Sequence, residues 1–174
     1  MRKEVLVAGM SVAIAGAAMA QVPGLGGIRV RAGYGWSGSI DSVSGSRKLA
    51  GPELGFDFPL TQLPLVTIAF TGDVLLGGQL SHGSDLDGYV YRFMLTGRAS
   101  VPASKFEIFG GVGYATAQAR NHEFGSINGF VSQLGVAIPL TSGLSTFSPS
   151  LEIAGSLASK SGLSGYSVSL AVRF

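Results

Sequence analysis

Positions 166–174 read YSVSLAVRF, a run in which large apolar side chains alternate with small or polar ones. Successive side chains of a β-strand point to opposite faces, so a period of two predicts a strand with one apolar face. The apolar set consists of Tyr166, Val168, Leu170, Val172 and Phe174. This stretch therefore predicts a strand whose apolar face carries an aromatic ring at each end.

The same alternation recurs upstream. It predicts further strands at 28–36, 53–58, 66–74, 89–98, 106–114, 128–138 and 150–157, which makes eight in all. The links at 59–64, 101–104 and 139–143 are tight. The links at about 38–47, 77–87, 117–127 and 158–164 are longer and rich in Ser, Gly and Asp. Short turns on one side and longer loops on the other are typical of an outer-membrane barrel.

Composition excludes several classes of protein. Hydrophobic residues make up 46% of the 174 positions and charged residues only 13%, which excludes a disordered chain. The absence of Cys excludes a disulfide framework and a thiolate metal site. The formal net charge of +2 gives no basis for a nucleic-acid partner. After residue 20 no apolar run approaches the roughly 18 residues of a spanning helix, so the apolar residues lie on strand faces.

The first twenty residues predict a secretory signal peptide. A basic start is followed by a run of small apolar residues and by AMA at positions 18–20. We expect cleavage between Ala20 and Gln21, an N-terminal extension at 21–26 and a barrel domain at 27–174. The alternative, an N-terminal membrane anchor, needs a longer apolar run.

Aromatic side chains sort by strand end. All five Tyr and the single Trp fall beside the longer loops, whereas Phe56, Phe58, Phe106, Phe147 and Phe174 fall beside the short turns. Aromatic rings favour the headgroup level of a bilayer, so the sorting predicts two girdles around an apolar band. Pro52 and Pro149 remove a ladder hydrogen bond, and we expect both near strand ends.

The chain resembles the small eight-stranded outer-membrane barrels of Gram-negative-type bacteria, a group with the opacity proteins and the barrels of outer membrane proteins A and X. GVGY at 111–114, QLGV at 133–136 and SVSLAVRF at 167–174 carry the resemblance. It implies an all-β, eight-stranded, antiparallel up-and-down transmembrane barrel. It also implies that the barrel-assembly machinery reads Tyr166, Val168, Leu170, Val172 and Phe174 as a C-terminal signal.

Alternation assigns a set of charged residues to the barrel interior: Arg29, Arg31, Glu53, Asp57, Asp73, Arg92, Arg98, Glu107, Glu152 and Arg173. Eight strands enclose only enough space for side chains, and buried charges must pair. We therefore expect a structural network of ion pairs in the lumen. The alternative is a narrow polar path lined by the same charges.

No catalytic, cofactor or metal site is expected. His82 and His122 lie on predicted loops near Ser81, Ser84, Asp85, Glu123 and Ser126, where such residues are ordinary. We expect a non-enzymatic outer-membrane protein with a structural or surface-interaction role. Its expected partners are outer-membrane lipid, the assembly machinery and an extracellular partner at the loops. The alternatives are a narrow, porin-like passive pore and a lipid-modifying enzyme.

Overall fold

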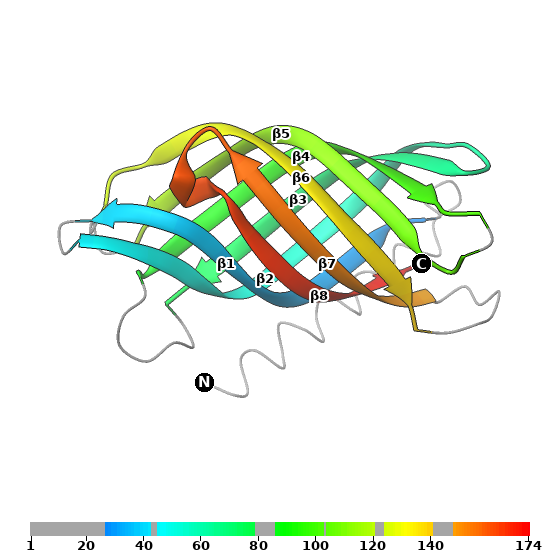
Figure 1. Ribbon diagram of the computed structural model, residues 1–174, viewed down its shortest axis with the longest axis horizontal. Helices are drawn as coiled ribbons and strands as arrows, with labels where there is room; N and C mark the ends of the chain where they lie inside the picture. Colours follow the sequence, from blue (N-terminus) through cyan, green and yellow to red (C-terminus); the bar gives the residue numbers. More distant parts are fainter. Residues whose placement is uncertain (1–26, 43–44, 79–85, 103, 121–123, 141–147) are drawn as a thin grey trace.

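The computed structural model describes residues 27–42, 45–78, 86–102, 104–120, 124–140 and 148–174. Its strands form one closed antiparallel barrel in which each pairs with its neighbours in sequence and the last pairs with the first (Figure 1). The strands are β1 Arg29–Ser42, β2 Gly45–Gln62, β3 Val66–Gly77, β4 Gly88–Ser100, β5 Glu107–Ala119, β6 Ile127–Pro139, β7 Ser148–Ala158 and β8 Gly165–Arg173. The predicted all-β, eight-stranded, up-and-down barrel is confirmed.

The barrel has two distinct ends. The connections β2–β3, β4–β5 and β6–β7 meet at one end, called here the turn end, together with Gly27 and Phe174. The other connections meet at the loop end, where the short 3₁₀ helix η1 (Ser161–Leu163) joins β7 to β8. Figure 1 shows η1 and the C-terminus at opposite ends of the barrel. The predicted signal peptide, its cleavage site at Ala20 and Gln21, and the extension at 21–26 lie outside the described residues.

The prediction of a first loop at about 38–47 is wrong for most of these residues. β1 and β2 continue as a paired ribbon as far as Ser42 and Gly45. A register shift between Trp36 and Ser39 marks where this extension begins. Its Ser- and Gly-rich composition resembles that of a loop, which is why periodicity alone did not identify it as strand. The other longer loops are close to their predicted positions, because β4, β6 and β8 begin at 88, 127 and 165.

Pro52 lies inside β2 rather than near its end, contrary to expectation. It pairs with Tyr34 of β1, and the ladder between β2 and β3 begins one residue later, at Glu53. Proline is tolerated where no ladder donor is needed on that side. Pro149 is the second residue of β7, near a strand end as expected.

The two faces of the barrel wall differ in polarity. Large apolar side chains are exposed on the outside, including Phe130, Leu134 and Leu157 at 75%, 75% and 76% exposure. Charged side chains such as Arg31, Asp57 and Glu152 are buried on the inside. This arrangement inverts that of a water-soluble barrel. Within the described residues, no helix has the length and apolar character to cross a membrane.

Aromatic rings cluster on the outer wall near the loop end. The ring of Trp36 stacks on Tyr166 with centroids 4.8 Å apart, and Tyr34 lies 4.7 Å from Trp36. Tyr89 and Tyr91 form a second pair on β4, 6.0 Å apart. These rings form the loop-end part of the predicted girdle. Phe147, assigned to the other girdle, lies outside the described residues.

Candidate functional site

The interior of the barrel brings nine of the ten predicted charged residues together. Because side chains alternate along each strand, odd-numbered positions of β1 and β2 deliver Arg29, Arg31, Glu53 and Asp57 to the lumen. β3, β4, β5 and β7 add Asp73, Arg92, Arg98, Glu107 and Glu152. All are buried except Glu107, whose side chain is 22% exposed.

Arg31 and Arg98 share Asp57. The Arg31 guanidinium donates to Asp57 Oδ1 at 2.7 Å and, through Nε, to Asp73 Oδ1 at 3.0 Å. The other oxygen of Asp57 accepts from Arg98 Nε at 2.8 Å, and the Thr71 hydroxyl donates to Oδ1 at 2.9 Å. Both carboxylate oxygens of Asp57 are thus satisfied, as burial requires.

Glu152 links the guanidiniums of Arg29 and Arg98. Arg29 donates to Glu152 Oε1 at 2.6 Å and to Glu107 Oε2 at 2.6 Å. Arg98 donates to Glu152 Oε2 at 3.2 Å, and therefore bridges Glu152 and Asp57. These contacts join β1, β2, β4, β5 and β7 across the lumen. The network therefore fills the lumen and also cross-links the strands of the barrel wall.

Glu53 and Arg92 form a separate pair closer to the middle of the barrel. Arg92 Nη1 donates to Glu53 Oε2 at 3.1 Å. Asp73 stands directly opposite Arg92 in the register of β3 and β4. Yet Asp73 Oδ2 and Arg92 Nε are buried without a hydrogen-bond partner among the described residues. Arg98 Nη1, in the layer around Asp57, also has no hydrogen bond among the described residues, although it lies 3.0 Å from Glu152 Oε1, so both layers hold unsatisfied polar atoms.

Arg173 does not belong to this network, contrary to the prediction. It is the last residue of β8, it is exposed, and no ion pair joins it to the interior charges. It pairs in register with Arg29 and so faces the lumen side, but at the mouth of the barrel. Without Arg173, the described interior holds five carboxylates and four guanidiniums. Alternation identified the face of Arg173 correctly but not its depth.

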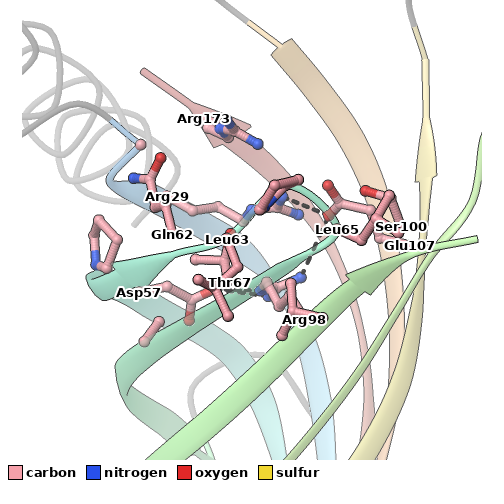
Figure 2. A pocket seen from close by; sticks show the side chains of 15 residues that line it. Arg29, Asp57, Gln62, Leu63, Leu65, Thr67, Arg98, Ser100, Glu107 and Arg173 are labelled. Carbon is pink, nitrogen blue, oxygen red and sulfur yellow. Dashed lines mark hydrogen bonds and ion pairs between the residues drawn. The ribbon is translucent and has the colours of Figure 1, made fainter.

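A cavity of about 130 Å³ opens at the turn end (Figure 2). Arg29, Asp57, Arg98 and Glu107 line its inner part, and Arg173 lines its outer part. Figure 2 shows the charged side chains converging on one another, with ion pairs across the space between them. The cavity is therefore a charged vestibule that ends at the ion-pair network.

Phe109 is an interior residue that the sequence reasoning did not single out. It is 4% exposed, and the Arg98 guanidinium lies 4.3 Å from the centre of its ring. The predicted strand at 106–114 includes it at an inward position, so strict alternation could have identified it. The other inward positions of this strand are Glu107, Gly111 and Gly113, which are polar or small. A large apolar residue among them does not fit the pattern of a polar face, so Phe109 was not recognised as inward-facing.

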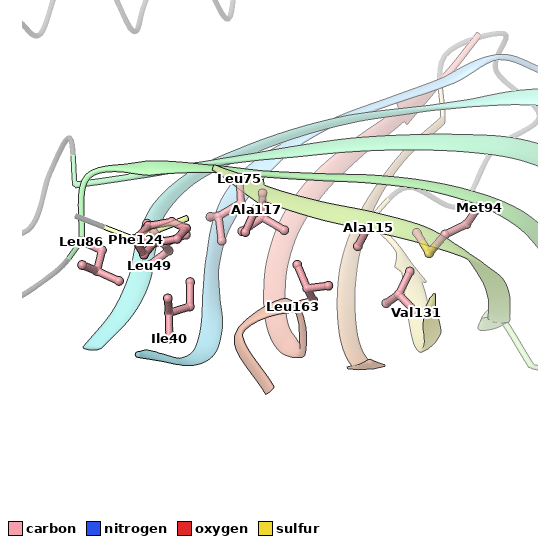
Figure 3. Close-up of a cluster of buried hydrophobic side chains, with 11 residues drawn as sticks. Ile40, Leu49, Leu75, Leu86, Met94, Ala115, Ala117, Phe124, Val131 and Leu163 are labelled. Carbon is pink, nitrogen blue, oxygen red and sulfur yellow. The ribbon is translucent and has the colours of Figure 1, made fainter. Parts of the chain in front are cut away.

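The loop-end half of the lumen is filled by apolar side chains (Figure 3). The cluster consists of Ile40, Leu49, Leu75, Leu86, Val90, Met94, Ala115, Ala117, Phe124, Val131 and Leu163. Leu163 of η1 is fully buried, so the connection between β7 and β8 contributes directly to this cluster. Ile40 comes from the ribbon that replaces the predicted first loop, and Leu49 lies on β2 just after that predicted loop. We call this set the apolar plug.

The residues considered for catalysis fall mostly outside the described chain. His82, Ser81, Ser84, Asp85, His122 and Glu123 are not among the described residues. Ser126 is described and exposed just before β6. Within the described ranges, no group of three His, Asp or Glu side chains is placed to hold a metal ion. The absence of a catalytic site among these loop residues therefore stays a prediction.

Three of the five residues predicted to form the assembly signal are exposed on the outer face of β8. Tyr166, Val168 and Leu170 are 57%, 40% and 57% exposed. Phe174 donates its backbone N–H to the Ile28 carbonyl, and its own carbonyl accepts from Gly27. The apolar stripe therefore lies on the outer wall beside the seam where β8 closes onto β1.

At the loop end, just beyond β5, neighbouring side chains on the outer face hold the guanidinium of Arg120 in place. Arg120 Nε donates to the Tyr89 hydroxyl at 2.9 Å, its Nη2 bonds the same oxygen, and its guanidinium lies 4.9 Å from the ring centre. The hydrogen bond with Tyr89 raises the pKa of Arg120 above its ordinary value. Asp87 lies 3.5 Å from Nη1. The orientation of this exposed side chain is therefore fixed by its neighbours.

No family model and no curated protein matches the chain. Solved structures with a similar fold include Neisserial surface protein A, with 13% identity, coverage of 84% of this chain and 95% of that one, and a TM-score of 0.49. The N-terminal β-barrel domain of Pseudomonas aeruginosa OprF has 12% identity, coverage of 84% and 96%, and a TM-score of 0.44. Ail, the attachment invasion locus protein of Yersinia pestis, has 13% identity, coverage of 85% and 97%, and a TM-score of 0.46. The likeness concerns the fold, which strand pairing establishes for this chain directly.

Proposed function

We propose that this chain is a non-enzymatic barrel of a bacterial outer membrane whose lumen is closed to solutes, and that it acts as a structural or surface component. The carrying observation is the inverted polarity of the wall. Leu134 and Leu157 are exposed outside, while Arg31 and Asp57 are buried inside. Only a surrounding apolar medium favours that arrangement.

Two sets of side chains, one after the other along the barrel axis, support closure of the lumen. Ion pairs around Asp57 and Glu152 span the turn-end half. The apolar plug occupies the loop-end half. A hydrated path would have to displace both. Barrels of eight strands enclose only enough space for side chains, which agrees with this reading.

Single-channel conductance of the refolded mature chain tests closure. Folding is first established by the heat-dependent shift in gel mobility and by flotation with vesicles. We expect no steps from folded, inserted protein. Reproducible steps that change with Arg92→Gln or Glu107→Gln would overturn the proposal and favour the narrow pore.

The surface role requires that the loop end faces outward from the cell. The ribbon of β1 and β2 extends at that end, and Ser46 is exposed on it, whereas Ser104 is exposed at the turn end. The chain contains no Cys, so single cysteines report position cleanly. In intact cells, a membrane-impermeant maleimide should label Ser46→Cys and not Ser104→Cys. The reverse labelling would contradict the proposed orientation.

A further inference from the structure

The charged vestibule at the turn end contains one guanidinium that no carboxylate neutralises. Arg173 lies directly opposite Arg29 across β8 and β1, and both side chains line the cavity of about 130 Å³. Arg29 pairs with Glu107 and with Glu152, each at 2.6 Å. Among the described residues, no ion pair involves Arg173. Like charges directly opposite each other on a sheet repel, so this position favours an added anion.

The lining of the vestibule carries a net positive charge. Its described charged residues are three guanidiniums and two carboxylates: Arg29, Arg98, Arg173, Asp57 and Glu107. Both carboxylates are already opposed, Asp57 by Arg98 at 2.7 Å and Glu107 by Arg29 at 2.6 Å. The surplus carboxylate of the interior belongs to the layer of Glu53 and Asp73, and neither of these residues lines the cavity.

A buried donor at the inner end of the same cavity also lacks a hydrogen bond. Arg98 is buried and lines the cavity, and its Nη1 has no hydrogen-bond partner among the described residues. This nitrogen lies 3.0 Å from Glu152 Oε1, where it gains charge attraction without the geometry of a hydrogen bond. The vestibule therefore combines an unsatisfied donor at its inner end with an unpaired cation at its mouth.

Apolar side chains lie beside these cations at the mouth (Figure 2). Leu63 and Leu65 of the β2–β3 connection line the cavity and are exposed, and Pro59 and Pro64 line it as well. A small inorganic anion gains nothing from such a surface, whereas an anion with a short apolar part removes that part from water there. The lining thus favours an amphipathic anion.

We propose that the vestibule is a binding site for a small monocarboxylate with a short apolar tail. Arg173 binds the carboxylate, which a planar guanidinium can contact through two parallel hydrogen bonds, and the tail packs against Leu63 and Leu65. The cavity has the volume of roughly four water molecules, which sets the ligand at about four to seven non-hydrogen atoms. The site is closed at its inner end by the ion-pair network, so binding requires no conducting lumen and goes beyond the proposed structural role.

Saturation-transfer NMR on the refolded mature chain in phosphatidylcholine nanodiscs tests the site, with butyrate as the probe. Butylammonium has the same tail and the opposite charge, and empty nanodiscs measure partition of each probe into lipid. We expect butyrate to bind at least tenfold more tightly than butylammonium. Equal binding of the two, or no binding of butyrate above the empty-nanodisc signal, would overturn the proposal.

Variants with matched controls locate the site. Arg173→Gln should weaken butyrate binding about tenfold or more, because it removes the unpaired cation. Lys105→Gln removes another exposed cation at the turn end that does not line the cavity, and should leave binding unchanged. Ser100→Glu places a carboxylate in the lining and should abolish binding, whereas Ser104→Glu adds the same charge outside the lining and should not.

The pattern across these variants decides between a site and general effects. Equal weakening by Arg173→Gln and Lys105→Gln would indicate diffuse charge attraction and overturn the site. Displacement of butyrate by an equal concentration of inorganic phosphate would show that the apolar lining contributes nothing, and would also overturn the proposal. Heat-dependent gel mobility establishes folding for every variant. Conductance is measured separately, so a chain that conducts and binds butyrate contradicts the closed lumen alone, whereas a silent chain without binding contradicts this site alone.

Discussion

The guanidinium of Arg98 packs against the ring of Phe109, 4.3 Å from its centre, and the two residues are direct partners across β4 and β5. Gly135 stands opposite Phe109 on β6, and a Cβ there would collide with the ring. Gly135 therefore makes room for Phe109, which in turn supports the guanidinium that bridges Asp57 and Glu152.

Gly135→Ala should destabilise the folded barrel by about 1–3 kcal/mol, because it overpacks the lumen against Phe109. Gly155→Ala is the matched change, since Gly155 has open space around it on the outer wall. It should cost nothing or stabilise slightly. Urea-induced unfolding from lipid vesicles measures both. Equal losses would show that the two variants report only the backbone, not the contact with Phe109.

Asp57→Asn should cost about 3–5 kcal/mol, because it leaves Arg31 and Arg98 buried with fewer acceptors. Asp73→Asn should cost clearly less, about 1–2 kcal/mol, since the interior already holds one carboxylate more than guanidiniums and Asp73 Oδ2 lacks a partner. The unfolding midpoints of the two variants, compared at one pH, test the ranking. A larger loss for Asp73→Asn would refute this account of the charge surplus.

Leu163→Ala should destabilise the barrel by about 2–5 kcal/mol, because it leaves a cavity in the apolar plug. Leu163→Met keeps the volume and should cost less than about 1.5 kcal/mol. The same unfolding assay distinguishes them. Similar small costs for both variants would mean that η1 does not pack into the lumen.

Leu134→Arg should cost about 2–4 kcal/mol, as charges on the lipid face do near the middle of a bilayer. Ser46→Arg, on the exposed ribbon at the loop end, should change stability by less than about 0.5 kcal/mol. Folding yield into vesicles and the unfolding midpoint both report the difference. A tolerated Leu134→Arg would argue against a lipid-facing belt.

Strand number, strand order and the inward charges could be predicted because the side-chain period of a strand is two and each face has one environment. Arg31, Asp57 and Glu152 were identified in this way, although their pairing could not be. Which guanidinium meets which carboxylate depends on register and on positions around the closed barrel, as the contact of Arg98 with both Asp57 and Glu152 shows.

The apolar plug was not anticipated. Ile40 and Leu49 stand at or beside a segment rich in Ser and Gly, and Leu163 falls in a predicted loop. No local pattern shows that these side chains turn inward. Their burial depends on strands that extend beyond the predicted length and on a connection that folds into the barrel mouth, both of which are tertiary features.

The seam between β1 and β8 is hydrogen-bonded like the other seams. It continues to the turn end, where the Gly27 backbone N–H donates to the Phe174 carbonyl at 2.6 Å. The two ends of the described barrel are therefore neighbours on the turn end. A short linker could join them, and the chain could be reopened between β1 and β2 at the loop end with the same eight pairings. The order in which strands are synthesised is thus separable from the architecture they form, and any segment fused to either end would emerge on the turn-end side of the barrel.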